Sequence, residues 1–105
     1  MELNGYTMQQ IKTATLDNDN LVLIVFIKPW DLDDINSLSE CVFKQLPDYQ
    51  LKERVQGADR EYFRFTYNNA YLILHFESYS ESCWIEPEDQ LENQQLMEIS
   101  SLLNS

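Results

Sequence analysis

The residues that could carry chemistry gather in one short stretch near the C-terminus, HFESYSESCWIE at positions 75–86. It holds the only histidine of the chain, His75, together with Cys83, Trp84 and Glu86. Histidine ordinarily titrates near neutral pH, so acid–base or nucleophilic catalysis is the first chemistry to consider. Either role would require a nucleophile or a carboxylate within hydrogen-bond reach of the imidazole.

Hairpin pairing predicts which of these side chains share a face of a sheet. If Asn68 and Asn69 form a two-residue turn and residues 78–81 form a loop, His75 lies between Tyr62 and Trp84 across three strands. Cys83 then points to the opposite face, because side chains alternate along a strand. A cysteine–histidine pair is therefore not predicted, and we expect a protein without enzymatic activity.

The same register predicts two faces of different character. One face carries the row Tyr62, His75 and Trp84 beside a second row formed by Arg64, Ile73 and Glu86, and a slip by one residue in either turn would exchange the faces. The candidate binding residues are Tyr62, Arg64, His75, Trp84 and Glu86. The other face is the predicted core, and it collects Phe63, Phe65, Leu72, Leu74, Phe76, Cys83 and Ile85.

Neither a metal nor a cofactor is expected from the sequence. The chain has no CxxC or HxxxH pair, and one histidine with two distant cysteines does not supply a typical zinc set. No segment has the spacing of a calcium-binding loop. With Gly5 and Gly57 as the only glycines, the chain also lacks a phosphate-cradling loop.

The charge balance indicates which partners to expect. Eighteen acidic residues stand against seven Lys and Arg, for a formal net charge of -11, and no basic residue follows Arg64. Such a surface repels nucleic acids and anionic membranes, and it attracts a basic protein. Acidity also serves solubility alone, so charge by itself does not require a partner.

Hydrophobic periodicity predicts the elements that position these residues, within a single domain spanning residues 1–105. The run LVLIVFI at 21–27 is apolar at every position, which predicts a central strand with both faces covered. Apolar residues from Leu32 onward recur every three or four positions, which predicts a helix that Pro47 ends. Pro87 and the acidic EPED sequence are expected to begin a final helix, whose apolar face is Leu91, Leu96, Ile99, Leu102 and Leu103.

The predicted fold class is α+β, a largely antiparallel sheet of about six strands with two helices packed on one face. The predicted order is β-β-α-β-β-β-β-α. The expected strands are residues 8–16, 21–27, 49–56, 60–67, 70–77 and 82–86.

Targeting signals are not apparent in the sequence. The first ten residues lack the basic and apolar regions of a signal peptide, and the apolar run 21–27 is too short to cross a bilayer. We therefore expect a cytoplasmic protein in which Cys41 and Cys83 are free thiols.

The segment REYFRFTYNNAYLILHFESYSESCWIEPED resembles an uncharacterised family of small acidic bacterial proteins, known as a domain of unknown function. The similarity lies in an aromatic strand, in LHFE at Leu74 to Glu77, and in WIE at Trp84 to Glu86. It covers most of the chain. The resemblance implies a bacterial cytosolic protein and implies no activity.

Two functional hypotheses follow. The first is a non-enzymatic acidic interaction module, such as an immunity protein, an inhibitor or a secretion-chaperone-like protein, whose five candidate residues bind a basic or mixed-charge protein or form a homodimer. The second is a small-ligand binding domain with a pocket between sheet and helix, lined by Trp30, Tyr49 or Tyr62. Nucleic acid and membrane partners are not expected under either hypothesis.

Overall fold

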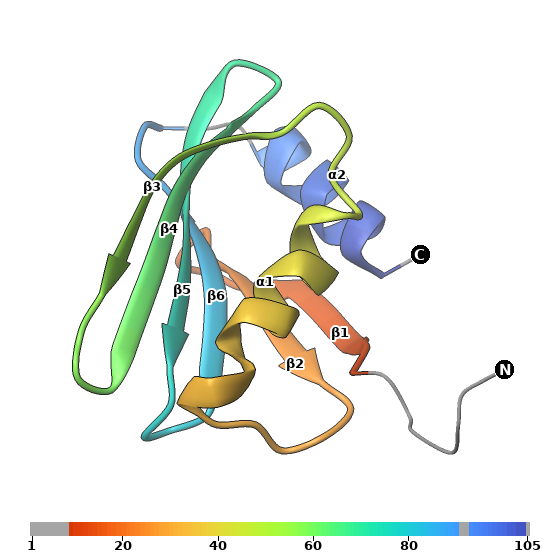
Figure 1. Cartoon of the computed structure of the whole chain (residues 1–105). Coiled ribbons are helices and arrows are strands. Elements are labelled where there is room, and N and C mark those ends of the chain that lie inside the picture. Colours follow the sequence, from red (N-terminus) through yellow and green to blue (C-terminus); the bar gives the residue numbers. More distant parts are fainter. Residues whose placement is uncertain (1–8, 91–92, 105) are drawn as a thin grey trace, which may run out of the picture.

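The computed structural model describes residues 9–90 and 93–104 and has the predicted order of elements (Figure 1). A short 3-10 helix, η1, precedes the first α-helix. The elements are β1 (Ile11–Leu16), β2 (Val22–Phe26), η1 (Leu32–Asp34), α1 (Ile35–Phe43), β3 (Gln50–Gln56), β4 (Arg60–Tyr67), β5 (Ala70–Glu77), β6 (Ser82–Pro87) and α2 (Asn93–Leu103).

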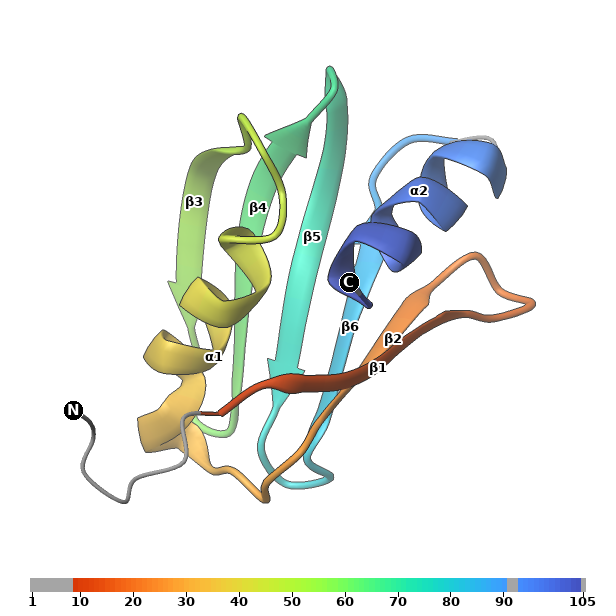
Figure 2. The same cartoon turned by 90° about the vertical axis from the view of Figure 1, so that its right-hand side faces the viewer.

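The six strands form one antiparallel sheet in the order β1-β2-β6-β5-β4-β3. Strands β3 to β6 are neighbours in sequence and pair as successive hairpins. The N-terminal hairpin β1–β2 joins this set by pairing β2 with β6, from Val22 opposite Ile85 to Ile24 opposite Cys83. Both helices lie on the same side of the sheet (Figure 2), so the α+β class predicted from the sequence is confirmed.

The register of the two central hairpins is the one expected from their turns. Asn68 and Asn69 have positive φ angles of 51° and 66°, as a two-residue hairpin turn requires, and Tyr67 lies opposite Ala70. At the next turn Glu77 lies opposite Ser82, and Glu81 takes the left-handed conformation with φ of 52°. Each side chain of β4, β5 and β6 therefore lies on its predicted face.

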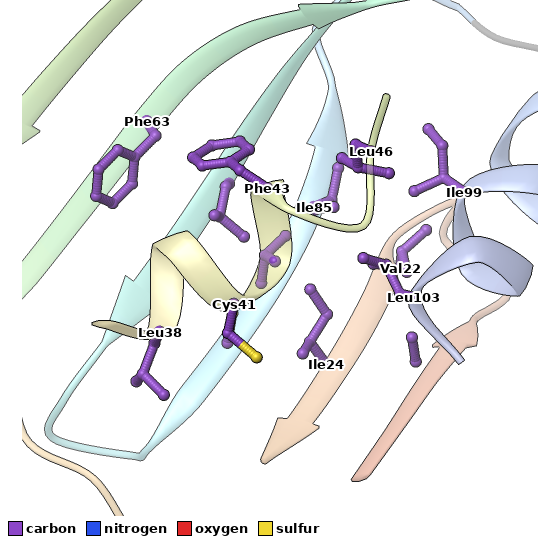
Figure 3. Close-up of a cluster of buried hydrophobic side chains, with 14 of the residues drawn as sticks. Val22, Ile24, Leu38, Cys41, Phe43, Leu46, Phe63, Ile85, Ile99 and Leu103 are labelled. Carbon is purple, nitrogen blue, oxygen red and sulfur yellow. The ribbon is translucent and has the colours of Figure 1, made fainter. Parts of the chain in front are cut away.

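The core fills the space between the helices and the inner face of the sheet (Figure 3). All seven predicted core residues of β4, β5 and β6 are buried. Leu38, Val42 and Phe43 contribute from α1, and Leu96, Ile99 and Leu103 from α2. One ion pair enters this layer, because Glu61 is 5% exposed and pairs with Arg54, whose guanidinium also reaches Asn36 of α1.

The first helix is shorter than its sequence pattern predicts. The Asp31 side chain caps its start by accepting from the backbone N–H of Asp33, and the chain then makes one 3-10 turn before α1. The α-helix ends at Phe43, before Pro47, and Leu46 is buried just beyond it. Leu32 belongs to the 3-10 turn and is 40% exposed, so it does not join the buried stripe.

The prediction that both faces of the strand at 21–27 are covered is wrong. Strand β2 does lie inside the sheet, between β1 and β6, but its burial alternates. Val22, Ile24 and Phe26 face the core, whereas Leu23 and Val25 are 40% and 50% exposed on the other face. A continuous apolar run indicates two covered faces only when layers pack on both sides, and here the described helices cover one.

The C-terminal segment departs from the prediction at its start. Pro87 does not lead into a helix, because it is the last residue of β6 and lies opposite Leu72. Glu86 belongs to the same strand, and Glu88 accepts hydrogen bonds from Arg64. In α2 the predicted residues Leu96, Ile99 and Leu103 are buried and Leu102 is partly buried, whereas Leu91 lies outside the described residues.

The two edges of the sheet differ. At β1 the Asn104 side-chain amide, just after α2, accepts from the N–H of Ala14 at 2.9 Å and donates to its C=O at 2.6 Å. The Ser100 hydroxyl donates to the same carbonyl at 2.7 Å. At the other edge all residues of β3 except the half-buried Val55 are exposed, and the strand has an irregular register between Leu51 and Glu53.

Candidate binding surface

The five candidate residues all lie on the sheet face opposite the described helices. We call this the outer face and define it by Tyr62, Arg64, His75, Trp84 and Glu86, together with Leu23 and Val25 of β2. One row of cross-strand neighbours runs through its middle. The row passes from Leu23 through Trp84 and His75 to Tyr62.

His75 lies at the centre of this row. Its ring stacks on Trp84 with centroids 4.7 Å apart and planes 10° apart, and Tyr62 flanks it at 5.9 Å. Its Nε2 is 2.8 Å from Glu86 Oε1, and the side chain is 18% exposed. An ionised carboxylate can only accept, so Nε2 of a neutral His75 carries the proton beside Glu86. The imidazole is thereby fixed in position by a stacked ring and a hydrogen bond.

Arg64 lies beside this row and is held by two carboxylates. Its Nε and one terminal nitrogen donate to the two oxygens of Glu88 at 3.1 and 3.0 Å, and its other terminal nitrogen donates to Glu53 at 3.2 Å. The hydrogen bond to Glu88, and then the one to Glu53, raise the pKa of the Arg64 guanidinium above its usual range. Bidentate geometry of this kind restricts the arginine to one orientation.

A third ion pair closes the opposite margin of the outer face, where Arg60 contacts Glu77. The Ser80 hydroxyl donates to the other Glu77 oxygen at 2.8 Å. Together the bond from Ser80 and the bond from Arg60 lower the pKa of Glu77. Arg60, Arg64 and His75 are thus each matched by an acidic partner within the chain.

Two features of this surface were missed in the sequence. The contacts of His75 with Glu86 and of Arg64 with Glu88 are not between directly opposite residues, but between diagonal neighbours or residues beyond the paired segment. The diagonal rule for antiparallel strands could have suggested the first, since Glu86 lies opposite Ile73, two residues from His75. The second feature is the exposed stripe of Leu23, Val25 and Ile27, with exposures of 40%, 50% and 43%.

Neither cysteine is placed to serve as a nucleophile beside His75. Cys83 is buried on the inner face, as predicted, and burial raises the pKa of its thiol well above the usual range. Cys41 of α1 is also buried and forms no disulfide. Within residues 9–90 and 93–104, no three histidine, cysteine or acidic side chains are grouped so that they could hold a metal ion.

The aromatic residues proposed for a ligand pocket are not brought together. Trp30 packs its edge against Phe76 in the core at 5.7 Å, Tyr49 stacks on Phe43 at 4.6 Å, and Tyr62 belongs to the outer face. A shallow groove of about 540 Å³ lies elsewhere, between the β1–β2 turn and the end of β6. Its lining is largely polar: Asp19, Asn20, Leu21, Glu86, Pro87, Glu88, Asp89 and Gln90.

Fold and surface together define an α+β protein with a six-stranded antiparallel sheet whose described helices cover one face. A family model described as "Protein of unknown function (DUF3630)" matches residues 11–104, and the chain belongs to this family. The predicted resemblance to an uncharacterised family is therefore confirmed. Searches among curated proteins and among solved structures gave no significant match. No helix in the described part of the chain has the length and apolar character needed to span a membrane.

Proposed function

We propose that this protein is a non-enzymatic interaction module that binds a basic or mixed-charge protein partner through the outer face. The observation that carries the proposal is the row of large side chains from Leu23 to Tyr62 on the sheet face opposite the described helices, in which Leu23 is exposed and the other members are partly exposed. An inhibitor, an immunity protein or a chaperone-like protein of the cytoplasm would act in this way. A homodimer formed through the same face is the competing outcome of the test below.

The apolar part of the surface supports this proposal. Leu23 and Val25 of β2, and Ile27 just after it, expose 40 to 50% of their surface, and Trp84 lies directly opposite Leu23. Contiguous exposed apolar side chains on a soluble protein commonly mark an interface. Trp, Tyr and Arg are also the residues that most often dominate binding energy when a partner buries them.

The charged part of the surface favours a partner with basic character. Arg60, Arg64 and His75 already contact acidic groups of the same chain, so a partner that covers them leaves no cation unpaired. The formal net charge of -11 then attracts a basic protein from a distance and accelerates its association. The same net charge opposes association with a second copy at low ionic strength.

The experiment is affinity capture from a lysate of the source cells, followed by purification of the captured protein and a direct titration. Two variants alter the outer face: Trp84→Ala removes the central ring, and Val25→Lys places a positive charge, which a basic partner would repel, at a half-exposed position. Met97→Ala is the matched control, because Met97 is 60% exposed on α2.

We expect the wild type and Met97→Ala to bind the same basic or mixed-charge protein with equal affinity. Both outer-face variants should bind it at least about tenfold more weakly, as for a truncated hot spot. Raising the salt from about 0.05 to about 0.5 M should weaken wild-type binding, because screening acts on the long-range attraction. Equal binding by all four proteins, or capture of only the chain itself, would refute the proposal.

A further inference from the structure

We propose that residues at the C-terminal end of α2 block the free edge of β1, and that this edge pairs with β1 of a second copy when their hydrogen bonds to Ala14 are broken. The inference starts from the hydrogen bonds of Ala14. Its N–H and C=O point away from β2 toward the open edge, where the Asn104 amide and the Ser100 hydroxyl satisfy them.

The Asn104 amide takes the place that a neighbouring strand would occupy. A paired residue in an antiparallel ladder exchanges one N–H···O bond in each direction with its partner. Asn104 does the same with Ala14 through its side chain, at 2.9 and 2.6 Å. Ala14 is 3% exposed and has the smallest side chain on β1, which allows α2 to approach the strand closely.

The opposite edge of the sheet, strand β3, differs from β1 in its charged residues. Both edge strands have an irregular register, β1 between Ile11 and Thr13 and β3 between Leu51 and Glu53. Strand β3 also carries two cations, Lys52 and Arg54, which discourage pairing with another strand. Strand β1 carries one charge, Lys12, in the sequence IKTATL. Its protection at Ala14 therefore comes from the residues of α2 rather than from its own side chains.

The sequence of β1 suits pairing with itself. In an antiparallel pair centred on Ala14, Thr13 lies opposite Thr15 twice, and Lys12 lies opposite Leu16. Threonine pairs are favourable across strands, and no like charges meet. For β3, centring the pair on Lys52, Glu53 or Arg54 always sets like charges opposite each other. The occupant that best fits the β1 edge is thus a second copy of this chain.

The test opens the edge with the double variant Ser100→Ala/Asn104→Ala. Its matched control is Ser101→Ala, which removes the same hydroxyl from an exposed position one residue along α2. Hydrogen exchange of the Ala14 amide reports whether the edge has opened, and light scattering after size exclusion reports the molar mass. If the double variant fails to fold by circular dichroism, the single variants Ser100→Ala and Asn104→Ala replace it.

At a protein concentration low enough that both proteins are monomeric, we expect Ala14 to exchange at least about fivefold faster in the opened variant than in the control, because its protecting bonds are lost. The opened variant should form a dimer that strengthens with salt, since screening reduces the repulsion between two acidic chains. This salt response is opposite to that of the proposed outer-face complex, so either idea can fail without the other.

Charges placed at positions 13 and 15 then test the register. In the opened background Thr13→Lys/Thr15→Asp sets opposite charges face to face and should strengthen the dimer. Thr13→Asp/Thr15→Asp sets like charges face to face and should abolish it. The proposal is overturned if the Ala14 amide of the monomeric opened variant exchanges no faster, if this variant stays monomeric at high concentration, or if its self-association does not respond to these charges.

Discussion

Glu77, at the end of β5, links the outer face to the β5–β6 turn. The Ser80 hydroxyl and the Arg60 guanidinium both donate to its carboxylate. These bonds favour the ionised form and lower the pKa of Glu77. A carboxylate with a lower pKa in the folded protein binds protons more readily in the unfolded chain, so its contribution to stability depends on pH.

Replacing Glu77 by Gln should therefore reduce the free energy of unfolding at neutral pH and leave it nearly unchanged in acid. The contribution of Glu77 is fully present above its unfolded pKa of about 4.3 and is lost as the pH falls through its lower folded value. Urea unfolding of both proteins from about pH 7 to about pH 3 measures this difference. A Glu77→Gln effect that stays constant over this range would contradict the prediction.

Glu40→Gln is the matched control for that comparison. Glu40 is an exposed residue of α1, where the same substitution removes a charge from a different part of the surface. If both variants lose stability equally at neutral pH, the loss does not come from the bonds that Ser80 and Arg60 make to Glu77.

At the residue scale, alternation predicted which side of the sheet each side chain occupies, but not which polar atoms meet. The separation of His75 from Cys83 follows from strand geometry alone. The bond from His75 to Glu86 depends on the rotamers of both side chains and on the local twist, which sequence patterns do not specify. The same holds for Arg54 of β3, which pairs with the buried Glu61 on the neighbouring strand β4, two residues from its direct cross-strand neighbour Phe63.

Among the structural elements, the β4–β5 turn has the most definite conformational requirement. Asn69 has a φ of 66°, in the left-handed region that is unfavourable for most side chains. Asn69→Ala should destabilise the protein by about 1 kcal/mol, because alanine keeps the Cβ atom but lacks the short polar side chain that makes this conformation less costly for asparagine. Asn69→Gly should change the stability by less than about 0.5 kcal/mol, since glycine accepts this conformation freely. Urea midpoints measure both changes, and equal losses would indicate that the asparagine amide matters more than the backbone.

The elements that were predicted correctly are those whose register is set by residues close to them in the sequence. The turn at Asn68 and Asn69 sets the register of β4 and β5, and the turn at residues 78–81 sets that of β6. The exposed face of β2 was misjudged, because its burial depends on which distant elements pack beside it. The pairing of β2 with β6 joins segments about sixty residues apart, which strand patterns alone do not reveal.

For the whole molecule, charge is distributed unevenly along the chain. Four of the seven basic residues, Lys52, Arg54, Arg60 and Arg64, lie in the β3–β4 hairpin, and the described acidic residues outside it are widely spread. A net charge of -11 on a chain of this size opposes the compact state by self-repulsion. Salt screens this repulsion over distances beyond about 10 Å at 0.1 M.

We therefore expect the urea midpoint to rise when salt increases from about 0.01 to about 0.15 M. A Glu40→Gln/Asp89→Asn variant, which carries two fewer negative charges at exposed positions, should show a smaller rise. A fall in the midpoint with salt would show that the ion pairs of Arg60 and Arg64 outweigh the general repulsion.

The strand order has a consequence for the protein as it leaves the ribosome. Synthesis releases β1 and β2 before the other described elements, yet β2 completes its pairing only with β6, which follows five further elements. Until residues 82–87 emerge, β2 lacks the strand with which it pairs in the folded sheet. The apolar residues of the β1–β2 hairpin are therefore exposed to aggregation during synthesis. Asp17 and Asp19 lie in the turn that joins β1 to β2, where their negative charges oppose aggregation of the unpaired hairpin.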